Sequence, residues 1–388
     1  MPLEILLLYD CLFPESIGGV EHRNECMARA LSDRGHHVTI GAWTKDPEPR
    51  TFEFALLPLA FGSKLHNEKG RRTILPSLKF ALACSRIDIR KFDVIETANI
   101  PYAHLLVLSA LCAWHKKPLV ITWHEFLGPY WPTYEKSAAA LLYRYFESVC
   151  AHLSPSAIAV SPLTAGRLQL TRGKSRPVSV VPNGIWVAGL AQILARPKIT
   201  VPALFYAGRL VREKRLDILL RAVTRMPHSS AEPLLGIVGD GPEKQHLEKL
   251  AEQLGITSRV KFYGKLADIE DMWHMLSNSR IAVTPSAREG FGMFACEAMG
   301  LGIPVVYCKG ENNAISALVR DGLDGYCVEP DPEAIANTLS HILNDKGLWQ
   351  KLSSSAKVRA ASYDWSIAAE KMETLFQKAI RDCQRDIG

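Results

Sequence analysis

The sequence lacks the patterns that mark membrane-spanning, secreted and disulfide-linked proteins. Its longest apolar run after the N-terminus, residues 105–114, is far shorter than the ~20 residues that cross a bilayer. Residues 1–9 are apolar but include Glu4 and have no basic flank, so they predict a first strand and not a signal peptide. The nine cysteines form no Cys-x-x-Cys pair, which gives no support for a disulfide framework or a zinc site and indicates a reducing cytoplasm.

A dinucleotide fingerprint and short repeats are also missing. The pattern Gly-x-Gly-x-x-Gly does not occur, so the sequence gives little support for a nicotinamide cofactor. What remains is a chain of 388 residues that is 47% hydrophobic and 22% charged, as in a soluble globular protein. This length predicts two domains of about 180 residues each.

The net charge of +6 lies mostly in the first 180 residues. A modest basic excess of this kind is usually only a solvated surface. It would also suit an N-terminal domain that rests on anionic lipid. The charge alone leaves both interpretations open.

Strand-like apolar runs alternate with helix-length segments in two successive series, which predicts two parallel sheets with helices on both faces. Pro and Gly cluster at residues 182–202, where the helical pattern lapses, so we place the domain boundary there. After Pro332 the chain is expected to be mostly helical. The predicted strands are residues 5–8, 38–42, 94–96, 119–122, 158–160 and 178–181, and then 204–207, 234–238, 260–262, 281–283, 305–307 and 325–328.

Residues 282–306 are the most informative stretch, because they read as a strand, a glycine turn, a short helix and a second strand. Glu289 falls in the turn and Glu297 in the helix. Gly290 and Gly292 would let a ligand approach the backbone at the carboxyl end of a buried parallel strand. A strand, turn and helix in this order is also ordinary scaffold, and the pattern by itself favours neither interpretation.

The same stretch resembles the Glu-x7-Glu signature of retaining glycosyltransferases of the GT-B fold, family 4. Glu-Gly-Phe-Gly stands at residues 289–292, Glu-Ala-Met at 297–299 and Gly-Ile-Pro-Val at 302–305. The resemblance implies that Glu289 contacts the donor sugar and Glu297 the nucleotide ribose. It also implies an α/β fold of two Rossmann-like domains facing a central cleft. Residues 1–184 would form the acceptor-side domain, completed by a C-terminal helix at 366–388 that crosses back, and 185–365 the donor-side domain.

Further motifs match the family along most of the chain. Gly18 and Gly19 precede a helix expected at residues 20–31 and resemble the glycine loop over the donor. His124 follows a buried strand and matches a histidine that contacts the donor sugar. Arg209 and Lys214 follow the first strand of the second series and resemble the diphosphate site, where Arg can bind phosphate oxygens in a bidentate manner.

The match is incomplete in one segment. Members of the family often have a Gly-Gly-x-x-Glu run beside the donor sugar, whereas this chain has Lys-Gly-Glu-Asn-Asn at residues 309–313. The Gly-Asp-Gly-Pro turn at residues 239–242 is shared with the family near the nucleotide, although many Rossmann units have similar turns.

Together these motifs define the predicted site. The proposed catalytic residues are His124, Arg209, Lys214 and Glu289. The proposed donor-binding residues are Gly18, Gly19, Arg209, Lys214, Gly239, Glu289, Gly290, Phe291, Gly292 and Glu297. No Asp-x-Asp motif lies near a plausible sugar site, so we expect neither a required divalent metal nor a cofactor other than the nucleotide-diphosphate sugar that serves as co-substrate.

The predicted activity is retaining transfer of a sugar to an acceptor hydroxyl, in the synthesis of a cell-envelope polysaccharide or glycolipid. The alternatives are another GT-B nucleotide-sugar enzyme, such as an epimerase or a phosphorylase-like protein, and a non-catalytic sugar-nucleotide binder. The expected partners are the donor, a sugar or lipid-linked acceptor and an anionic membrane surface, with no nucleic acid. The location would be the cytoplasm or the inner face of the membrane.

One segment bears on the membrane partner. Residues 71–91 place Leu75, Leu78, Leu82 and Ile89 on one side of a predicted helix, with basic residues over the rest. Such a helix could lie on a membrane surface. More often its apolar side packs on the sheet of its own domain, and we expect this arrangement here.

Overall fold

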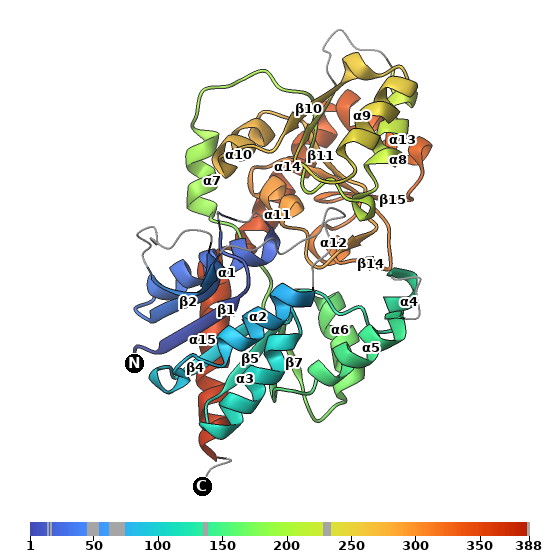
Figure 1. Cartoon of the computed structure of the whole chain (residues 1–388). Helices are drawn as coiled ribbons and strands as arrows, with labels where there is room; N and C mark the ends of the chain where they lie inside the picture. The colour runs from blue at the N-terminus through green and yellow to red at the C-terminus, as the bar shows by residue number, and fades with distance from the viewer. Residues whose placement is uncertain are drawn as a thin grey trace. The chain divides into compact units, whose positions relative to one another are not determined.

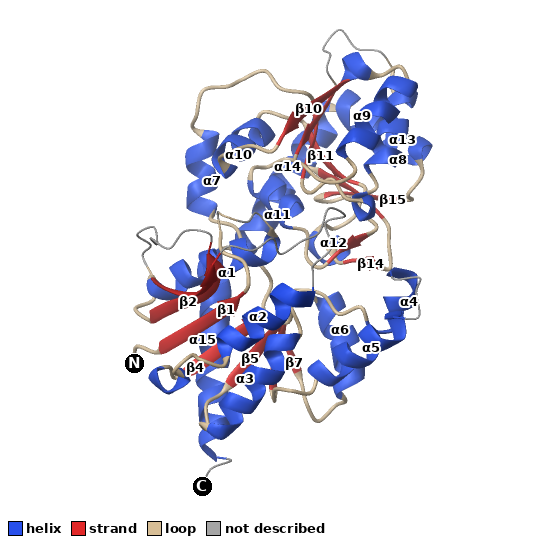
Figure 2. Ribbon diagram, viewed as in Figure 1, coloured by secondary structure: helices blue, strands red, loops and turns tan. Residues whose placement is uncertain are grey.

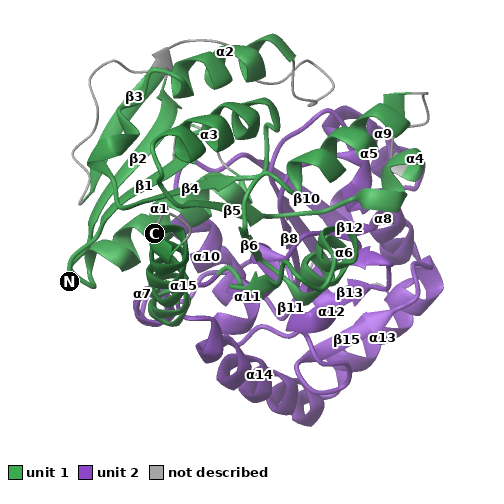
Figure 3. Ribbon diagram, turned by 90° about the horizontal axis from the view of Figure 1, so that it is seen from below, with its two compact units in different colours: residues 1–67, 71–183, 365–388 green, residues 68–70, 184–364 purple. Residues whose placement is uncertain are grey.

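A computed structural model describes residues 1–13, 15, 18–44, 54–61, 74–134, 139–227 and 234–385 (Figure 1). The chain divides into two compact units, which Figure 3 shows in different colours. The described residues within 1–183 and 365–385 form unit 1, and those within 184–364 form unit 2. Each unit is an α/β domain built on a parallel sheet, as the alternation of apolar runs predicts (Figure 2).

The sheet of unit 1 has seven parallel strands in the order β3-β2-β1-β4-β5-β6-β7. All six runs predicted in the first half of the chain are strands. The edge strand β3 is an addition; it contains Pro58, and a proline that cannot donate to a neighbouring strand is tolerated at an edge. The strands are β1 (Glu4–Tyr9), β2 (His37–Thr44), β3 (Ala55–Phe61), β4 (Val94–Ala98), β5 (Leu119–Trp123), β6 (Ser156–Ala159) and β7 (Val178–Val180).

Helices cover both faces of this sheet. Figure 3 shows α2 and α3 on one side of it and α1 and α15 on the other. The C-terminal helix α15 packs along α1 and contacts β4 and β5, so the end of the chain completes the domain that its beginning forms. The helices are α1 (Gly19–Ser32), α2 (Ile74–Cys84), α3 (Ala103–Trp114), α4 (Trp131–Tyr134), α5 (Ala139–Cys150), α6 (Pro162–Arg172) and α15 (Trp365–Arg385).

The sheet of unit 2 has six parallel strands in the order β10-β9-β8-β11-β13-β15, and all six were predicted. A separate pair, β12 (Arg288–Glu289) and β14 (Asn312–Asn313), was not. The main strands are β8 (Leu204–Ala207), β9 (Leu235–Val238), β10 (Val260–Gly264), β11 (Ile281–Thr284), β13 (Val305–Cys308) and β15 (Gly325–Val328). The helices are α7 (Val187–Leu194), α8 (Leu216–Arg225), α9 (Lys244–Gln253), α10 (Ile269–Ser277), α11 (Met293–Gly300), α12 (Ile315–Leu318), α13 (Pro332–Asn344) and α14 (Lys346–Ala360).

Two local predictions were wrong. Residues 182–202 were expected to lack a helix, but α7 forms there, because Leu190 and Ile193 are buried one turn apart and the helix packs on α10. The helix in 71–91 was expected to bury Leu75, Leu78, Leu82 and Ile89, yet the three leucines are exposed, and only Ile89, in a separate turn after the helix, is buried. Its buried side carries Phe80, Ala81 and Cys84 instead, and Arg71 and Arg72 lie outside the described residues.

All nine cysteines are free thiols, and seven of them are buried. Among the described helices, none combines the length and the apolar character needed to span a bilayer.

Candidate functional site

The strand order of unit 2 places its switch point between β8 and β11. The chain runs outward from β8 to β10 on one side, and from β11 to β15 on the other. The loops that leave the carboxyl ends of these two central strands therefore diverge, and ligands of open α/β sheets bind in the opening between such loops. Arg209 and Lys214 come from the loop after β8, and Glu289 comes from the loop after β11.

An ion pair joins these two loops. Lys214 Nζ lies 2.5 Å from Glu289 Oε1, and both side chains are largely shielded from solvent. The backbone links the same loops, because Ala287 N donates to the Glu213 carbonyl at 2.9 Å. Arg209 is an exposed residue of the same β8 loop, and its carbonyl accepts a hydrogen bond from the buried Tyr206 hydroxyl at 3.3 Å. The structure thus brings Lys214 and Glu289 together although 74 residues separate them.

The carboxylate of Glu289 has a second donor. Ser286 Oγ donates to Glu289 Oε1 at 2.8 Å, and Thr284 Oγ1 lies 3.1 Å from the same serine hydroxyl. The Glu289 backbone is fixed as well, since its carbonyl accepts from Ala314 N at 2.9 Å and its strand β12 pairs with β14. Glu289 is therefore held at both side chain and backbone before any ligand binds.

Asn313 organises this corner and was not predicted as a site residue. Its side chain is 1% exposed and donates to the carbonyls of Ser286 and Cys308, at 3.0 Å each. Its Oδ1 accepts from Ile315 N at 3.1 Å. One amide thus ties the β11 loop, the end of β13 and the start of α12 together. The only sequence feature that pointed to Asn313 was the segment 309–313, which ends at this residue and differs from the Gly-Gly-x-x-Glu run of the family.

Two glycines in unit 2 are required by the backbone. Gly292 has φ +99° before α11, and a Cβ there would lie 2.6 Å from Ile315 Cγ1. Gly239 has φ +136°, and a Cβ would lie 1.9 Å from the Gly208 carbonyl, so the turns after β8 and β9 touch. Phe291 is buried and its ring packs against Tyr363, whereas Gly290 between it and Glu289 is partly exposed. Gly292 thus permits α11 to start directly beside Glu289.

Glu297 lies in α11 and is 5% exposed. Burial raises the pKa of its carboxyl to about 8, and the indole of Trp273 opposes this shift in part. At neutral pH the group is mostly protonated in the free protein. A buried carboxyl of this kind gains its charge more readily when a ligand supplies hydrogen-bond donors.

In unit 1 the switch point lies between β1 and β4. Gly18 caps α1 with an extended backbone, and Gly19 is the first residue of that helix. His124, after β5, is buried, and its backbone N–H donates to Asn99 Oδ1 at 3.1 Å. No described residue hydrogen-bonds its buried Nε2. Burial, and less strongly the charge of Arg23, holds the pKa of His124 well below its usual range, so the imidazole is neutral.

Arg23 is a second feature that the sequence did not reveal. Its guanidinium is almost fully buried, and Nη1 donates to Asn183 Oδ1 at 3.2 Å. Burial lowers the pKa of Arg23 to about 10, while the charge of Glu96 opposes this shift. Burial also raises the pKa of Glu96. Arg23 and Glu96 are thus both buried in unit 1, and Glu96 lies in β4, the strand that ends just before Asn99.

Glu147 fixes the loop that follows His124. Its carboxylate accepts from the backbone N–H of Leu127 and Gly128, at 3.1 and 2.6 Å. The Tyr102 hydroxyl and the Trp131 indole also donate to it, at 2.8 and 2.9 Å. Burial raises the pKa of Glu147, and these four donors oppose the shift because they favour the charged form.

Glu147→Gln should therefore destabilise unit 1. The amide nitrogen of Gln would face donors that need an acceptor, which costs about 1–3 kcal/mol of unfolding free energy for an unsatisfied buried group. Urea unfolding of the variant beside wild type measures this loss. Glu370→Gln on the exposed side of α15 is the matched control and should change stability by less than about 0.5 kcal/mol. An equal effect of both substitutions would contradict the assignment.

Three possible metal ligands lie together on α1. The ligand atoms of His22, Glu25 and Cys26 are within 4.8 Å of one another. A nitrogen, a carboxylate oxygen and a sulfur could hold a divalent ion such as Zn²⁺. These three residues belong to unit 1, whereas the Lys214–Glu289 pair belongs to unit 2.

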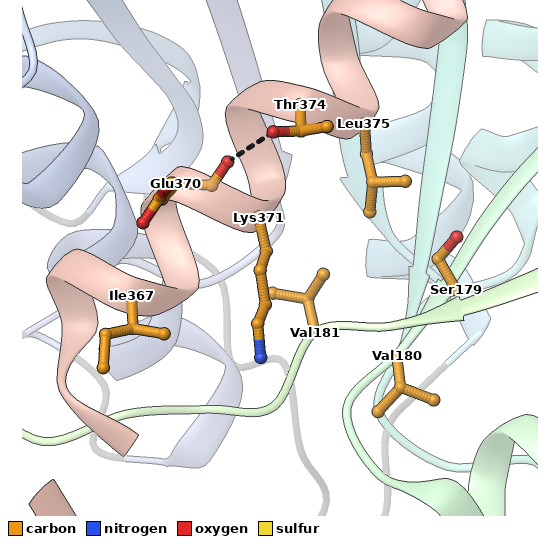
Figure 4. Close-up of a pocket in the computed structure, with 8 residues that line it drawn as sticks. All are labelled: Ser179, Val180, Val181, Ile367, Glu370, Lys371, Thr374 and Leu375. Atoms are coloured by element: carbon orange, nitrogen blue, oxygen red, sulfur yellow. Dashed lines mark hydrogen bonds between the residues drawn. The ribbon is translucent and has the colours of Figure 1, made fainter. Parts of the chain in front are cut away.

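A cavity of about 430 Å³ lies on unit 1 between α15 and the end of β7 (Figure 4). In Figure 4 the side chains of Lys371 and Leu375 point from α15 toward Val180 and Val181. None of the predicted site residues lines it. The lining residues are Ser179, Val180, Val181, Ile367, Glu370, Lys371, Thr374 and Leu375.

Two family models match most of the chain. Residues 17–188 match the model described as Glycosyltransferase Family 4, and residues 196–359 match Glycosyl transferases group 1. The D-inositol 3-phosphate glycosyltransferase of Streptomyces griseus is 31% identical over 211 residues, which are 51% of this chain and 44% of that protein. The chain thus spans about half the length of the curated relatives that it matches.

Solved structures share the fold over nearly the whole chain. Sucrose-phosphate synthase from Thermosynechococcus elongatus superposes with a TM-score of 0.79 at 22% identity, covering 97% of this chain and 99% of that one. Anabaena HepE, in a complex with UDP and glucose, superposes with a TM-score of 0.74 at 20% identity, covering 97% of this chain and all of that one. At these identities the likeness establishes the GT-B fold.

Proposed function

Because the chain belongs to the GT-B glycosyltransferases of group 1, we propose that it moves a sugar from a nucleotide-diphosphate donor to an acceptor hydroxyl and retains the anomeric configuration. The observation that carries this proposal is the ion pair between Lys214 and Glu289 at the switch point of unit 2. It joins a cation suited to a diphosphate and a carboxylate suited to sugar hydroxyls, at the position where ligands of such sheets bind.

In unit 2 we assign Arg209 and Lys214 to the donor diphosphate, Glu297 to the ribose and Glu289 to the sugar. The N-terminus of α11 after Gly292 offers free backbone N–H groups beside them. In unit 1 we assign His124 and the loop of Gly18 and Gly19 to the donor sugar. A neutral His124 suits a hydrogen-bonding role better than that of a cationic acid.

The chemistry that these residues favour is dissociative. As the bond from the sugar to the diphosphate breaks, negative charge grows on the leaving group, and fixed cations such as Lys214 stabilise it more in the transition state than in the ground state. The acceptor hydroxyl attacks from the face of the departing diphosphate, and a phosphate oxygen of the donor takes its proton. Retention then needs no covalent intermediate on Glu289. Arg209 and Lys214 neutralise the charge on the leaving diphosphate, which in other enzymes a divalent metal can do.

The acceptor that we propose is a sugar or a lipid-linked sugar, in the synthesis of a cell-envelope polysaccharide or glycolipid. A lipid-linked acceptor would require the protein to work at a membrane surface. Two other functions remain candidates: an epimerase or phosphorylase-like reaction, and donor binding without turnover. Product analysis with and without an acceptor separates all three, because only a transferase makes a new glycoside that depends on the acceptor.

We expect the purified protein to bind UDP, and we would titrate it by calorimetry with UDP, GDP and ADP. HepE is a structural neighbour that holds UDP, so UDP is the first choice. Arg209→Ala should weaken binding at least ~10-fold, since a charge-assisted bond to phosphate is worth about 1.5–3 kcal/mol.

Two variants complete this experiment. Glu297→Ala should weaken nucleotide binding as well, by loss of the ribose contact. Arg196→Ala serves as the control, because Arg196 follows α7 and pairs with the exposed Glu270 of α10, and neither residue belongs to the β8 or β11 loop. Equal binding by the wild type, Arg209→Ala and Glu297→Ala would remove the basis of the assigned site.

A further inference from the structure

Three neighbouring side chains of α1 carry three different kinds of metal-binding atom. His22, Glu25 and Cys26 are spaced i, i+3 and i+4, which places Glu25 and Cys26 one turn along the helix from His22. The imidazole nitrogen, the carboxylate oxygen and the thiol sulfur all lie within 4.8 Å of one another. Among the described residues, no other group of three or more His, Cys, Asp or Glu side chains converges in this way.

The distances between these atoms match a tetrahedral zinc site. Cys26 Sγ lies 3.7 Å from His22 Nε2 and 3.4 Å from Glu25 Oε2. With Zn–S bonds of about 2.3 Å and Zn–N or Zn–O bonds of about 2.0–2.2 Å, a tetrahedron separates the sulfur from its neighbouring ligand atoms by about 3.5–3.7 Å. An ion placed between the three atoms can therefore bond to all of them with only small rotations of the side chains.

The donor atoms also select the class of ion. A sulfur and an imidazole nitrogen favour Zn²⁺ and similar transition-metal ions over Mg²⁺ and Ca²⁺, which prefer oxygen ligands. Cys26 is fully buried, whereas His22 and Glu25 are half-buried and border on solvent. An ion can thus enter from the solvent side, and water can occupy the fourth tetrahedral position.

The structure holds the three ligands in place before an ion binds. The ring of His22 packs on Phe13 with 5.0 Å between the ring centroids, and the His22 backbone N–H donates to the Gly18 carbonyl at 3.2 Å. The thiol of Cys26 already faces the carboxylate of Glu25, and α1 packs along α15 (Figure 3). Because little has to become ordered, the entropic cost of binding an ion is small.

We propose that His22, Glu25 and Cys26 bind one Zn²⁺ ion and that this ion stabilises unit 1. As the Zn–S bond forms, the S–H bond of Cys26 breaks and its proton passes to solvent. The ion binds the folded helix, and the unfolded chain lacks this arrangement, so binding adds to stability by mass action. The ion takes no part in the proposed sugar transfer, and the inference does not rest on that function.

Calorimetric titration with Zn²⁺ tests this proposal, on protein purified without a histidine tag, treated with a chelator and kept in a reductant without thiols. The wild type should bind one Zn²⁺ and bind Mg²⁺ far more weakly. Zn²⁺ at about 100 times its Kd should raise the Tm by about 5 °C or more. Co²⁺ in place of Zn²⁺ should give the near-ultraviolet charge-transfer band of a thiolate ligand, which reports Cys26 directly.

Matched substitutions assign the site. Cys26→Ser and His22→Asn should each weaken Zn²⁺ binding roughly 100-fold, since loss even of an outer-shell partner of a metal costs about 10–100-fold. His22 is half-buried, so His22→Asn should fold even if Ser at the buried position 26 does not. The controls Cys383→Ser on α15 and His246→Asn on α9 should bind Zn²⁺ like the wild type.

Three results would overturn the zinc site. They are a wild type that binds no Zn²⁺, a cobalt band that persists in folded Cys26→Ser, and equal Zn²⁺ affinity of His22→Asn and His246→Asn. UDP titration of the metal-free wild type keeps this test apart from the proposed function. Failure to bind UDP would count against the donor site alone, because the zinc ligands are not among its residues.

Discussion

Lys214→Ala is expected to lower kcat by roughly 10²–10³-fold, the largest effect of any single substitution considered for this chain. Lys214 is the cation that the structure places on Glu289 at the unit 2 switch point, 2.5 Å from its carboxylate. Its removal takes a positive charge from the leaving diphosphate. It also leaves Glu289 uncompensated beside a ligand of the same sign.

A double-mutant cycle separates these two losses. If the charge of Glu289 opposes catalysis once Lys214 is gone, the variant with Lys214→Ala and Glu289→Gln should lose less activity than the two single losses combined. Lys214→Arg keeps the charge and should retain part of the activity. Arg196→Ala, which breaks the exposed pair with Glu270, should leave kcat within about twofold. A loss of less than threefold in Lys214→Ala would contradict the proposed role.

Glu297→Gln is expected to stabilise the free protein and weaken nucleotide binding, with both effects growing as the pH rises. The pKa of Glu297 is raised to about 8 by burial, whereas an unfolded chain has a Glu pKa near 4.3. Stability from the buried neutral carboxyl is therefore present in full below about pH 4 and is lost progressively up to about pH 8. Across this range the wild type should lose about 4 kcal/mol relative to the Gln variant.

Thermal unfolding of both proteins at several pH values measures the first effect. The Tm difference should increase from acid to about pH 8 and then stay level. For the second effect, UDP affinity of the wild type should rise over the same range relative to Glu297→Gln, because ribose hydroxyls donate better to a carboxylate. A Tm difference that does not change with pH would show that Glu297 is charged throughout and that its environment is not the one described.

The prediction from the sequence agrees best with the structure for the buried strands of the two sheets. Apart from the edge strand β3, the parallel strands of both sheets were predicted, because most of them are buried and read as short apolar runs between turn residues. The predicted helix at residues 20–31 is α1, one residue longer at each end. The edge strand β3 was missed although residues 55–61 are apolar, since Pro58 in its middle argues against a strand, and β12 and β14 are only two residues long.

The helix of residues 74–84 shows where the pattern is ambiguous. Both of its sides are apolar, and hydrophobic spacing reports that a stripe exists but not which stripe meets the sheet. Phe80 and Cys84 face the core, and Leu75, Leu78 and Leu82 do not. Only the packing of α2 against its own sheet and α3 decides this. The sequence therefore identified this stripe of leucines but could not decide whether it meets the sheet or faces outward.

Local sequence determined the elements that carry the candidate site residues. These are a glycine turn with Glu289, a helix with Glu297 and a loop with Arg209 and Lys214. These features depend on neighbours along the chain. The tertiary structure decided which of them meet: strand order sets β8 beside β11, so that Lys214 reaches Glu289, and Asn313 joins three segments through one buried amide. Arg23 and Glu147 likewise have no motif, because their partners are distant in sequence and are chosen only when the sheet of unit 1 assembles.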